Sequence, residues 1–329
     1  MRVAEHRSTS WRPGWIVASS IHDDTSISSA GALSVARSTI RDVLFDCEAL
    51  LGSQPCGGLD CALWGKSEGL PPGVVYPLVG HLLDVAAVAW WAWDLHLVDL
   101  QRRVLVAGMG LDPDRVEDSE RARALLACWA GWHDVGKIGG FQRKDAEAYE
   151  FLHGYDPLDA GVVSSHGHVT HLFLAHALPA LGYDADGGGL ALASPARRVA
   201  QMLAGHHGRY PAPPSRRALR SAAIRDRELG GGEWDRQRRL HLAAVADAVE
   251  RPAAPPMLSA EAAVLATEVV VLADWLASQE RHVEAQLHAI GEAGGGSLEG
   301  HWDRAMKAAP ALIDDAGLLV PQWKETPLT

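Results

Sequence analysis

The sequence of 329 residues predicts an all-α fold. Long apolar segments at residues 76–89, 122–132 and 261–282 are typical of buried helices, and glycine, proline or charged residues bound them. Strand signals are weak throughout, and the chain contains no internal repeat. The composition, with 47% hydrophobic and 22% charged residues, is that of a globular protein with a sizeable core.

Charge, cysteines and apolar runs exclude several classes of protein. The formal net charge of -11 argues against a protein that coats nucleic acid through bulk charge, although a local basic groove or bound cations could still hold a phosphate backbone. Cys47, Cys56, Cys61 and Cys128 show no CxxC spacing, so they indicate neither a zinc ribbon nor a disulfide framework. The chain starts without a signal peptide, and the apolar run at 85–93 is too short to span a bilayer. We therefore expect a soluble cytoplasmic protein with no membrane partner.

Residues 1–58 are the least informative part of the chain. A Ser/Thr-rich stretch precedes a segment with the pattern of an amphipathic helix at 32–51, and Gly57-Gly58 then breaks the pattern. We interpret 1–58 as an N-terminal extension, 59–290 as the main domain, and 291–329 as a C-terminal helical segment and tail.

The first buried helix is expected at 76–89, after the turn at 71–73. His81 lies among its apolar residues, where a lone histidine is more often a hydrogen-bonded core residue than a metal ligand. Asp84 follows three residues later on the same face. We expect Asp84 to orient or charge-compensate the His81 imidazole.

The second apolar helix, 122–132, ends by presenting His133 and Asp134 side by side, with Gly136 and Lys137 directly after them. Neighbouring helical residues point about 100° apart, so this imidazole and this carboxylate can reach two metals, or two sides of one. A buried carboxylate is costly unless it is paired, hydrogen-bonded or metal-bound. An isolated pair would favour a core histidine beside a helix-terminal aspartate. Other histidines in matching contexts favour a metal centre instead.

Residues 153–176 hold five histidines. They are His153, His166, His168, His171 and His176. His168 and His171 share a helical face, whereas His166 lies at an expected helix start. Most of the five are expected to be surface or capping residues, and one metal ligand among them would suffice.

The next helix, 196–204, ends in Gly205-His206-His207-Gly208. Adjacent histidines cannot point the same way inside a regular helix, but at a helix end they can converge on one metal. A Pro-rich and Arg-rich segment follows up to Arg239. Acidic residues are interleaved with these arginines. A solvated linker and helix face is therefore at least as well supported for this segment as a nucleic-acid-binding patch.

The last strong helix is expected at 261–282 and carries Asp274 among apolar residues. This carboxylate needs a partner, and a cation or a ligand histidine would serve. A further helix is expected at 298–312. Trp132, Tyr210 and Trp275 could stack on bases, but apolar surroundings favour core packing for Trp132 and Trp275.

Five phrases in this order resemble the HD nuclease domain of the CRISPR type I effector nuclease-helicase, a member of the HD superfamily of metal-dependent phosphohydrolases. The phrases are Leu63–Ser67, Tyr76–Val85, Trp132–Lys137 with Phe141-Gln142, Gly205–Gly208 and Ala273–Ser278. The resemblance covers residues 60 to 285 or so, and it implies an HD-domain helical bundle with metal ligands converging from several helices.

The resemblance implies two metal sites that share Asp134. His81, His133, Asp134 and Asp274 correspond to one site, and Asp134, His166, His206 and His207 correspond to the second. His166 is preferred over His168 because it precedes Gly167, where the family has its single histidine. Asp134 and Lys137 are the expected catalytic residues, with Lys137 near the scissile phosphate.

The family cleaves single-stranded DNA, chiefly the strand displaced by a guide-RNA surveillance complex, and so serves antiviral defence. Two metals can clamp the attacking and leaving oxygens of a phosphodiester. Imidazole-rich ligation suits iron, manganese, nickel or cobalt better than magnesium. The chain has no GxxxxGK[ST] phosphate loop, so the helicase half is expected in trans or as a missing part of a longer protein. Residues 291–329 would then form a linker to that half.

Two other functions compete with this one. An HD phosphohydrolase acting on nucleotides would use the same metals with a closed pocket for one base. A non-catalytic module that recruits a CRISPR complex would keep the fold without turnover.

Overall fold

The computed structural model describes residues 58–71, 73–150, 152, 154–158, 164–185, 194–214, 217, 219, 221, 227, 229–292 and 297–320. Outside these residues lie 1–57 of the extension expected at 1–58, with its helix at 32–51, and also His153 and much of the Arg-rich segment. Helices dominate the described part of the chain, which confirms the predicted all-α fold with the addition of one small sheet. The α-helices are α3 (Leu78–Leu95), α4 (Asp99–Gly108), α5 (Val116–Trp132), α6 (Ala146–Tyr149), α7 (His166–Ala177), α8 (Pro195–Ala204), α11 (Glu233–Ala248), α12 (Ala260–Ala277), α13 (Glu280–Glu292) and α14 (Leu298–Asp315).

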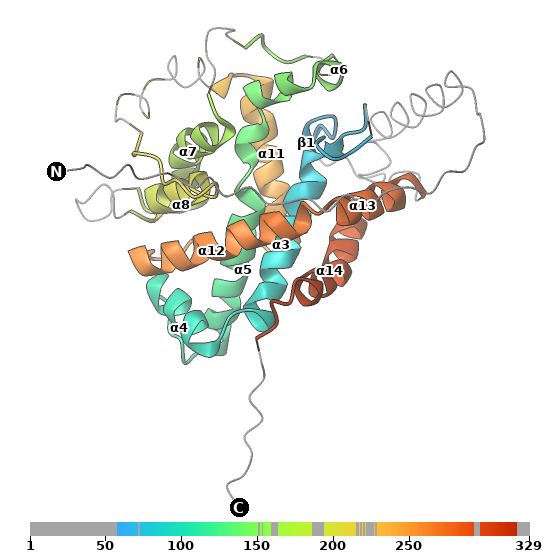
Figure 1. Cartoon of the computed structure of the whole chain (residues 1–329). Coiled ribbons are helices and arrows are strands. Elements are labelled where there is room, and N and C mark those ends of the chain that lie inside the picture. The colour runs from blue at the N-terminus through green and yellow to red at the C-terminus, as the bar shows by residue number, and fades with distance from the viewer. Residues whose placement is uncertain are drawn as a thin grey trace, which may run out of the picture.

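Helix α3 is the centre of the fold, and α5, α11, α12 and α14 pack around it (Figure 1). Its residues from Leu78 to Ala89 are all buried, which explains why their sequence is almost continuously apolar. By length and composition α3 could cross a membrane, but 78% of it is buried inside the protein. This burial is typical of the core helix of a globular domain.

The helix expected from residue 76 begins two residues later, at Leu78. Tyr76–Pro77 instead form strand β2, which pairs antiparallel with β1 (Trp64–Lys66). Proline disfavours the helical conformation in the residue before it, so Tyr76 stays extended. A Cβ on Gly65 would lie only 3.2 Å from the Leu78 Cα atom. Glycine therefore lets β1 approach the start of α3 closely.

Asp84 has partners other than the one expected, and the prediction that it orients His81 is wrong. The Tyr76 hydroxyl donates to Asp84 Oδ2 over 2.5 Å, and His301 Nε2 lies 3.0 Å from Oδ1. His282 Nε2 lies 3.4 Å from Oδ2, whereas neither ring nitrogen of His81 has a hydrogen-bond partner in the part of the chain that the structure describes. The fully buried carboxylate thus ties β2, α13 and α14 to α3.

The single helix expected at 261–282 is two helices, α12 and α13, because the chain leaves the helix at Ser278. In the described part of the Arg-rich segment, Arg236 and Arg239 lie on an exposed face of α11 and pair with Glu233 and Asp235, as expected for a solvated helix face. One arginine differs from that expectation. Arg238 in α11 is fully buried and donates to the carbonyls of Ile138, Leu229 and Gly230. These three main-chain carbonyls bind its guanidinium inside the core.

Candidate metal centre

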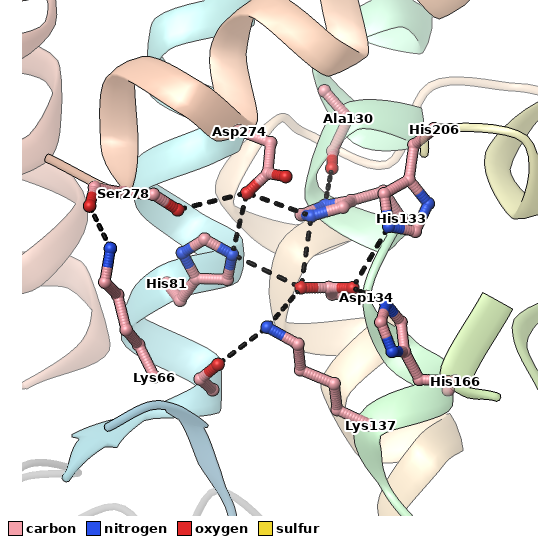
Figure 2. Close-up of polar contacts among 12 residues, drawn as sticks. Lys66, His81, Ala130, His133, Asp134, Lys137, His166, His206, Asp274 and Ser278 are labelled. Atoms are coloured by element: carbon pink, nitrogen blue, oxygen red, sulfur yellow. Dashed lines mark hydrogen bonds and ion pairs between the residues drawn. The ribbon is translucent and has the colours of Figure 1, made fainter. Parts of the chain in front are cut away.

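The structure brings seven predicted ligands together at one end of α3 and α5. Figure 2 labels all of them except His207. They come from five separate segments. His81 belongs to α3, His133 and Asp134 follow α5, His166 begins α7, His206 and His207 follow α8, and Asp274 belongs to α12.

Asp134 lies between two groups of histidines. Its Oδ2 atom is 3.4 Å from His81 Nε2 and 3.3 Å from His133 Nε2. Its Oδ1 atom is 3.3 Å from His166 Nε2 and 3.4 Å from His206 Nε2. Each oxygen of this one carboxylate therefore faces a different pair of imidazoles.

The remaining two residues complete the groups. Asp274 Oδ1 lies 3.4 Å from His81 Nε2 and 3.5 Å from His133 Nε2. His207 Nε2 lies 2.7 Å from His166 Nε2. Within each group, His81–His133–Asp134–Asp274 and His166–His206–His207, the ligand atoms lie within 4.8 Å of one another.

Gly136 is what allows α7 to approach Asp134. A Cβ at this position would lie 2.0 Å from the His166 carbonyl oxygen and 2.5 Å from the Thr170 nitrogen. The Gly136 N–H donates to Thr170 Oγ1, and that hydroxyl donates to the His133 carbonyl. Ser165 caps α7 by accepting from the His168 N–H, so His166 becomes the first residue of the helix. The turn 135–137 and α7 are thus locked together with His166 facing Asp134.

The main chain fixes the tautomers of two histidines. His133 Nδ1 lies 2.7 Å from the Ala130 carbonyl oxygen, and His206 Nδ1 lies 2.6 Å from that of Leu203. A carbonyl only accepts hydrogen bonds, so each Nδ1 carries the proton and each neutral ring keeps a lone pair on Nε2. This arrangement is common for histidines that bind metals.

The centre fits divalent cations, as its unsatisfied atoms show. Among the described residues, the Nε2 atoms of His81, His133 and His206 and the Oδ1 atom of Asp134 are buried without a hydrogen-bond partner. A buried polar atom without a partner costs about 1–3 kcal/mol. Metal coordination would satisfy all four, and a set of imidazole nitrogens and carboxylate oxygens suits a first-row transition metal.

Burial and charge act against each other on these groups. Burial alone would lower the pKa of His133, but the carboxylates of Asp134 and Asp274 outweigh it and raise the pKa to about 10. Burial would raise the pKa of Asp134, yet His133 and Lys137 hold it well below its ordinary value. Burial lowers the pKa of His166 to about 3, so this ring is neutral at pH 7. A divalent cation would take the place of the proton on His133.

Two lysines border the centre. Lys137 Nζ lies 2.6 Å from Asp134 Oδ2 and donates to the Gly65 carbonyl over 2.6 Å. Lys66 Nζ donates to the Ser278 carbonyl, and burial lowers its pKa although Asp274 attracts the charge. No pattern in the sequence predicts a role for Lys66 or Ser278. The only signal was that both lie in segments that resemble the family, Lys66 in Leu63–Ser67 and Ser278 in Ala273–Ser278.

The other aromatic and histidine candidates lie in different surroundings. His168 is exposed, in contrast to His166. Trp132 is buried as expected and donates to the Leu242 carbonyl. Trp275 is 70% exposed, so its predicted core packing is wrong. It follows Asp274 directly but faces the solvent side of α12. Tyr210 is 48% exposed.

The chain resembles known proteins over most of its length. The model of a family described as Cas3, HD domain, matches residues 64–283. The chain is similar to a crystal structure of T. fusca Cas3-ATP at 36% identity and a TM-score of 0.67, which covers 81% of this chain and 28% of that one. A chain in a CRISPR RNA-guided surveillance complex, pre-nicking, matches at 35% identity and a TM-score of 0.64, covering 78% of this chain and 29% of that one.

A smaller structure shows likeness of fold. The Thermus thermophilus Cas3 HD domain in the presence of Ni²⁺ matches at 22% identity and a TM-score of 0.52, covering 85% of this chain and 91% of that one. No match was found among curated proteins. The chain therefore spans less than a third of the T. fusca protein, but nearly all of an isolated HD domain.

Proposed function

This chain belongs to the Cas3 HD-domain family, and from that premise we propose that it is a metal-dependent nuclease that cleaves single-stranded DNA in CRISPR type I interference. The observation that carries the proposal is the position of Asp134, whose two oxygens face the two groups of histidines. Such a shared carboxylate is suited to a pair of cations.

We assign the ligands to two sites. His81, His133, Asp134 and Asp274 would hold one divalent ion, and Asp134, His166, His206 and His207 would hold the second. When bound, the ions supply Lewis-acid chemistry for hydrolysis of a phosphodiester. Iron, manganese, nickel or cobalt fits this imidazole-rich set better than magnesium.

The chain's own residues prepare the site for a phosphate. The carbonyls of Ala130 and Leu203 accept from Nδ1 of His133 and His206, so Nε2 is the nitrogen that remains for a cation. The Lys137 ammonium stands beside Asp134, where it would stabilise negative charge developing on the phosphate. Exposed Trp275 and Tyr210 offer aromatic faces on which unpaired bases could stack.

The partners follow from the family and are part of the proposal. A guide-RNA surveillance complex of a type I system would displace the DNA strand, and a helicase half in trans or elsewhere in a longer protein would feed it to this site. We place the activity in the cytoplasm, where such complexes meet DNA. Residues 59–290 would form the nuclease domain and 291–329 the connection to the helicase, although α14 packs against α3.

The test is cleavage of circular single-stranded DNA by metal-stripped protein to which manganese, nickel, cobalt, iron(II) or magnesium is returned. Circular DNA has no ends, so its cleavage identifies an endonuclease. We expect cleavage with a transition metal and none without metal. Linear DNA cut while circles stay intact would indicate an exonuclease.

The same assay separates the competing functions. Hydrolysis of nucleotides with intact oligonucleotides would identify an HD phosphohydrolase of small substrates. Metal binding without turnover of either substrate would identify a binding module. Either result would overturn the nuclease proposal.

A further inference from the structure

The break between α12 and α13 leaves a main-chain acceptor beside the metal centre. Ser278 ends α12 with φ −87° and ψ 0°, while its N–H still donates to the Asp274 carbonyl over 2.9 Å. Because the helix stops here, the Ser278 carbonyl lies outside the helical hydrogen-bond pattern. It accepts from Lys66 Nζ instead.

The Ser278 side chain acts on Asp274. Its hydroxyl donates to Asp274 Oδ1 over 3.2 Å. The same oxygen lies 3.4 Å from His81 Nε2 and 3.5 Å from His133 Nε2. A serine hydroxyl at this position limits rotation of the carboxylate and keeps Oδ1 between the two imidazoles (Figure 2).

Strand β1 supplies the other end of this connection. Gly65 allows the strand to lie against α3, because a Cβ there would come within 3.3 Å of His81 Cβ. The Gly65 carbonyl accepts from Lys137, and the next residue, Lys66, reaches across to Ser278. One short strand therefore contacts both sides of the centre.

We infer that Lys66 and Ser278 are positioning residues. Lys66 fixes the Ser278 main chain, and the Ser278 hydroxyl fixes the Asp274 carboxylate in the position where it would bind a metal. The inference rests on the metal centre of the proposed function and names two residues that hold one of its ligands in place. Hydrogen bonds to a carboxylate ligand commonly change metal affinity about 10–100-fold when they are removed.

The inference is tested by titrating the metal-stripped full chain with Mn²⁺ in a calorimeter, which measures the affinity of each binding step. Ser278→Ala keeps the carbonyl but removes the hydroxyl, and we expect one binding step to weaken about 10-fold. The other step, at His166, His206 and His207, should not change. Lys66→Met should weaken the same step, and Lys66→Arg should restore it.

Coupling between the two residues gives a sharper readout. Because both act through Asp274, Lys66→Met should have a smaller effect when Ser278 is already alanine. Lys307→Met, an exposed lysine on α14, is the matched control and should leave both steps unchanged.

Three outcomes would overturn the inference. Unchanged Mn²⁺ affinity in Ser278→Ala would show that the hydroxyl does not position Asp274. Tighter binding in Lys66→Met would show that Lys66 acts by repelling cations. Unchanged Mn²⁺ affinity in Lys66→Met, together with slower cleavage at saturating Mn²⁺, would show that Lys66 contacts the phosphate and does not position Asp274. If the wild-type chain binds Mn²⁺ but does not cut DNA, only the nuclease proposal is rejected. The Mn²⁺ affinities of the Lys66 and Ser278 variants still test this inference.

Discussion

Lys137 Nζ lies 2.6 Å from Asp134 Oδ2, the oxygen that also faces His81 and His133. The two residues are three positions apart, and the turn formed by Val135–Lys137 brings the ammonium back over the carboxylate. The Gly65 carbonyl holds the same ammonium from the other side. Lys137 is therefore fixed next to the most shared ligand of the proposed centre.

Lys137→Met should lower kcat for single-stranded DNA about 100-fold, because one fixed donor to the developing charge is lost. Metal content should stay near that of the wild type, since Lys137 is not a ligand. Cleavage rates with saturating Mn²⁺ and metal analysis check both parts. Lys144→Met is the control, because Lys144 also lies over the Phe141 ring. Equal losses in both variants would contradict a specific role for Lys137.

Asp134→Ala should abolish cleavage and lower the content of bound metal at both sites. The reason is that its two oxygens serve different groups of histidines. Metal analysis after dialysis and the circular-DNA assay measure the two effects. Retained nuclease activity with full metal occupancy would refute the shared-ligand assignment.

His166→Ala should lose most of the activity and part of the bound metal, whereas His168→Ala should be mild. His166 Nε2 lies 3.3 Å from Asp134 Oδ1. His168 is two residues later in the same helix and exposed, so it is a closely matched control. The two variants are compared for cleavage and for metal content. The reverse result would assign the ligand to His168.

The grouping of the candidate ligands could be predicted from the sequence, whereas the residues that support them could not. His81 and Asp274 lie in apolar helices and His133 directly follows one, where a buried polar residue needs a partner, and the order of the family motifs linked the three. The partners of Asp84 could not be found this way. Helical spacing placed it near His81, but His282 and His301, about 200 positions later, bind it in the fold.

Two further errors have the same origin. The break at Ser278 has no glycine or proline to mark it, and the carbonyl it releases is bound by Lys66 from a distant strand. Trp275 has apolar neighbours in sequence, yet its side of α12 faces solvent. Local pattern gives the helix and its composition, whereas the direction of each face depends on which elements pack against it.

Asp84→Asn should destabilise the protein by about 3 kcal/mol at pH 7, because it removes the charge that Tyr76, His282 and His301 bind. Burial alone would raise the pKa of Asp84, but the two histidines outweigh it and lower the pKa below its ordinary value. Urea unfolding at several pH values measures the free energy of unfolding of both proteins.

The sign of the pH dependence follows from that shift. A carboxyl whose pKa is lowered by folding stabilises the native state above its unfolded pKa of about 3.9 and loses that contribution as the pH falls through the folded pKa. The difference in the free energy of unfolding between the wild type and Asp84→Asn should therefore decrease as the pH falls below about 4. Asp303→Asn, on the exposed side of α14, should show little difference at any pH. A gap that stays constant down to pH 2 would contradict this role of the charge.

Trp275→Ala should weaken binding of single-stranded DNA while leaving metal content unchanged. The side chain is 70% exposed and adjacent in sequence to Asp274, and a stacked base contributes about 1–3 kcal/mol. We expect KM for an oligonucleotide to rise about 10-fold, with kcat little changed, since no ligand or charge is removed. Leu100→Ala is the control, because Leu100 on α4 is 71% exposed and far in sequence from every proposed ligand. Trp275→Phe should recover part of the affinity, because it keeps an aromatic face. An unchanged KM in Trp275→Ala would remove this residue from the DNA path.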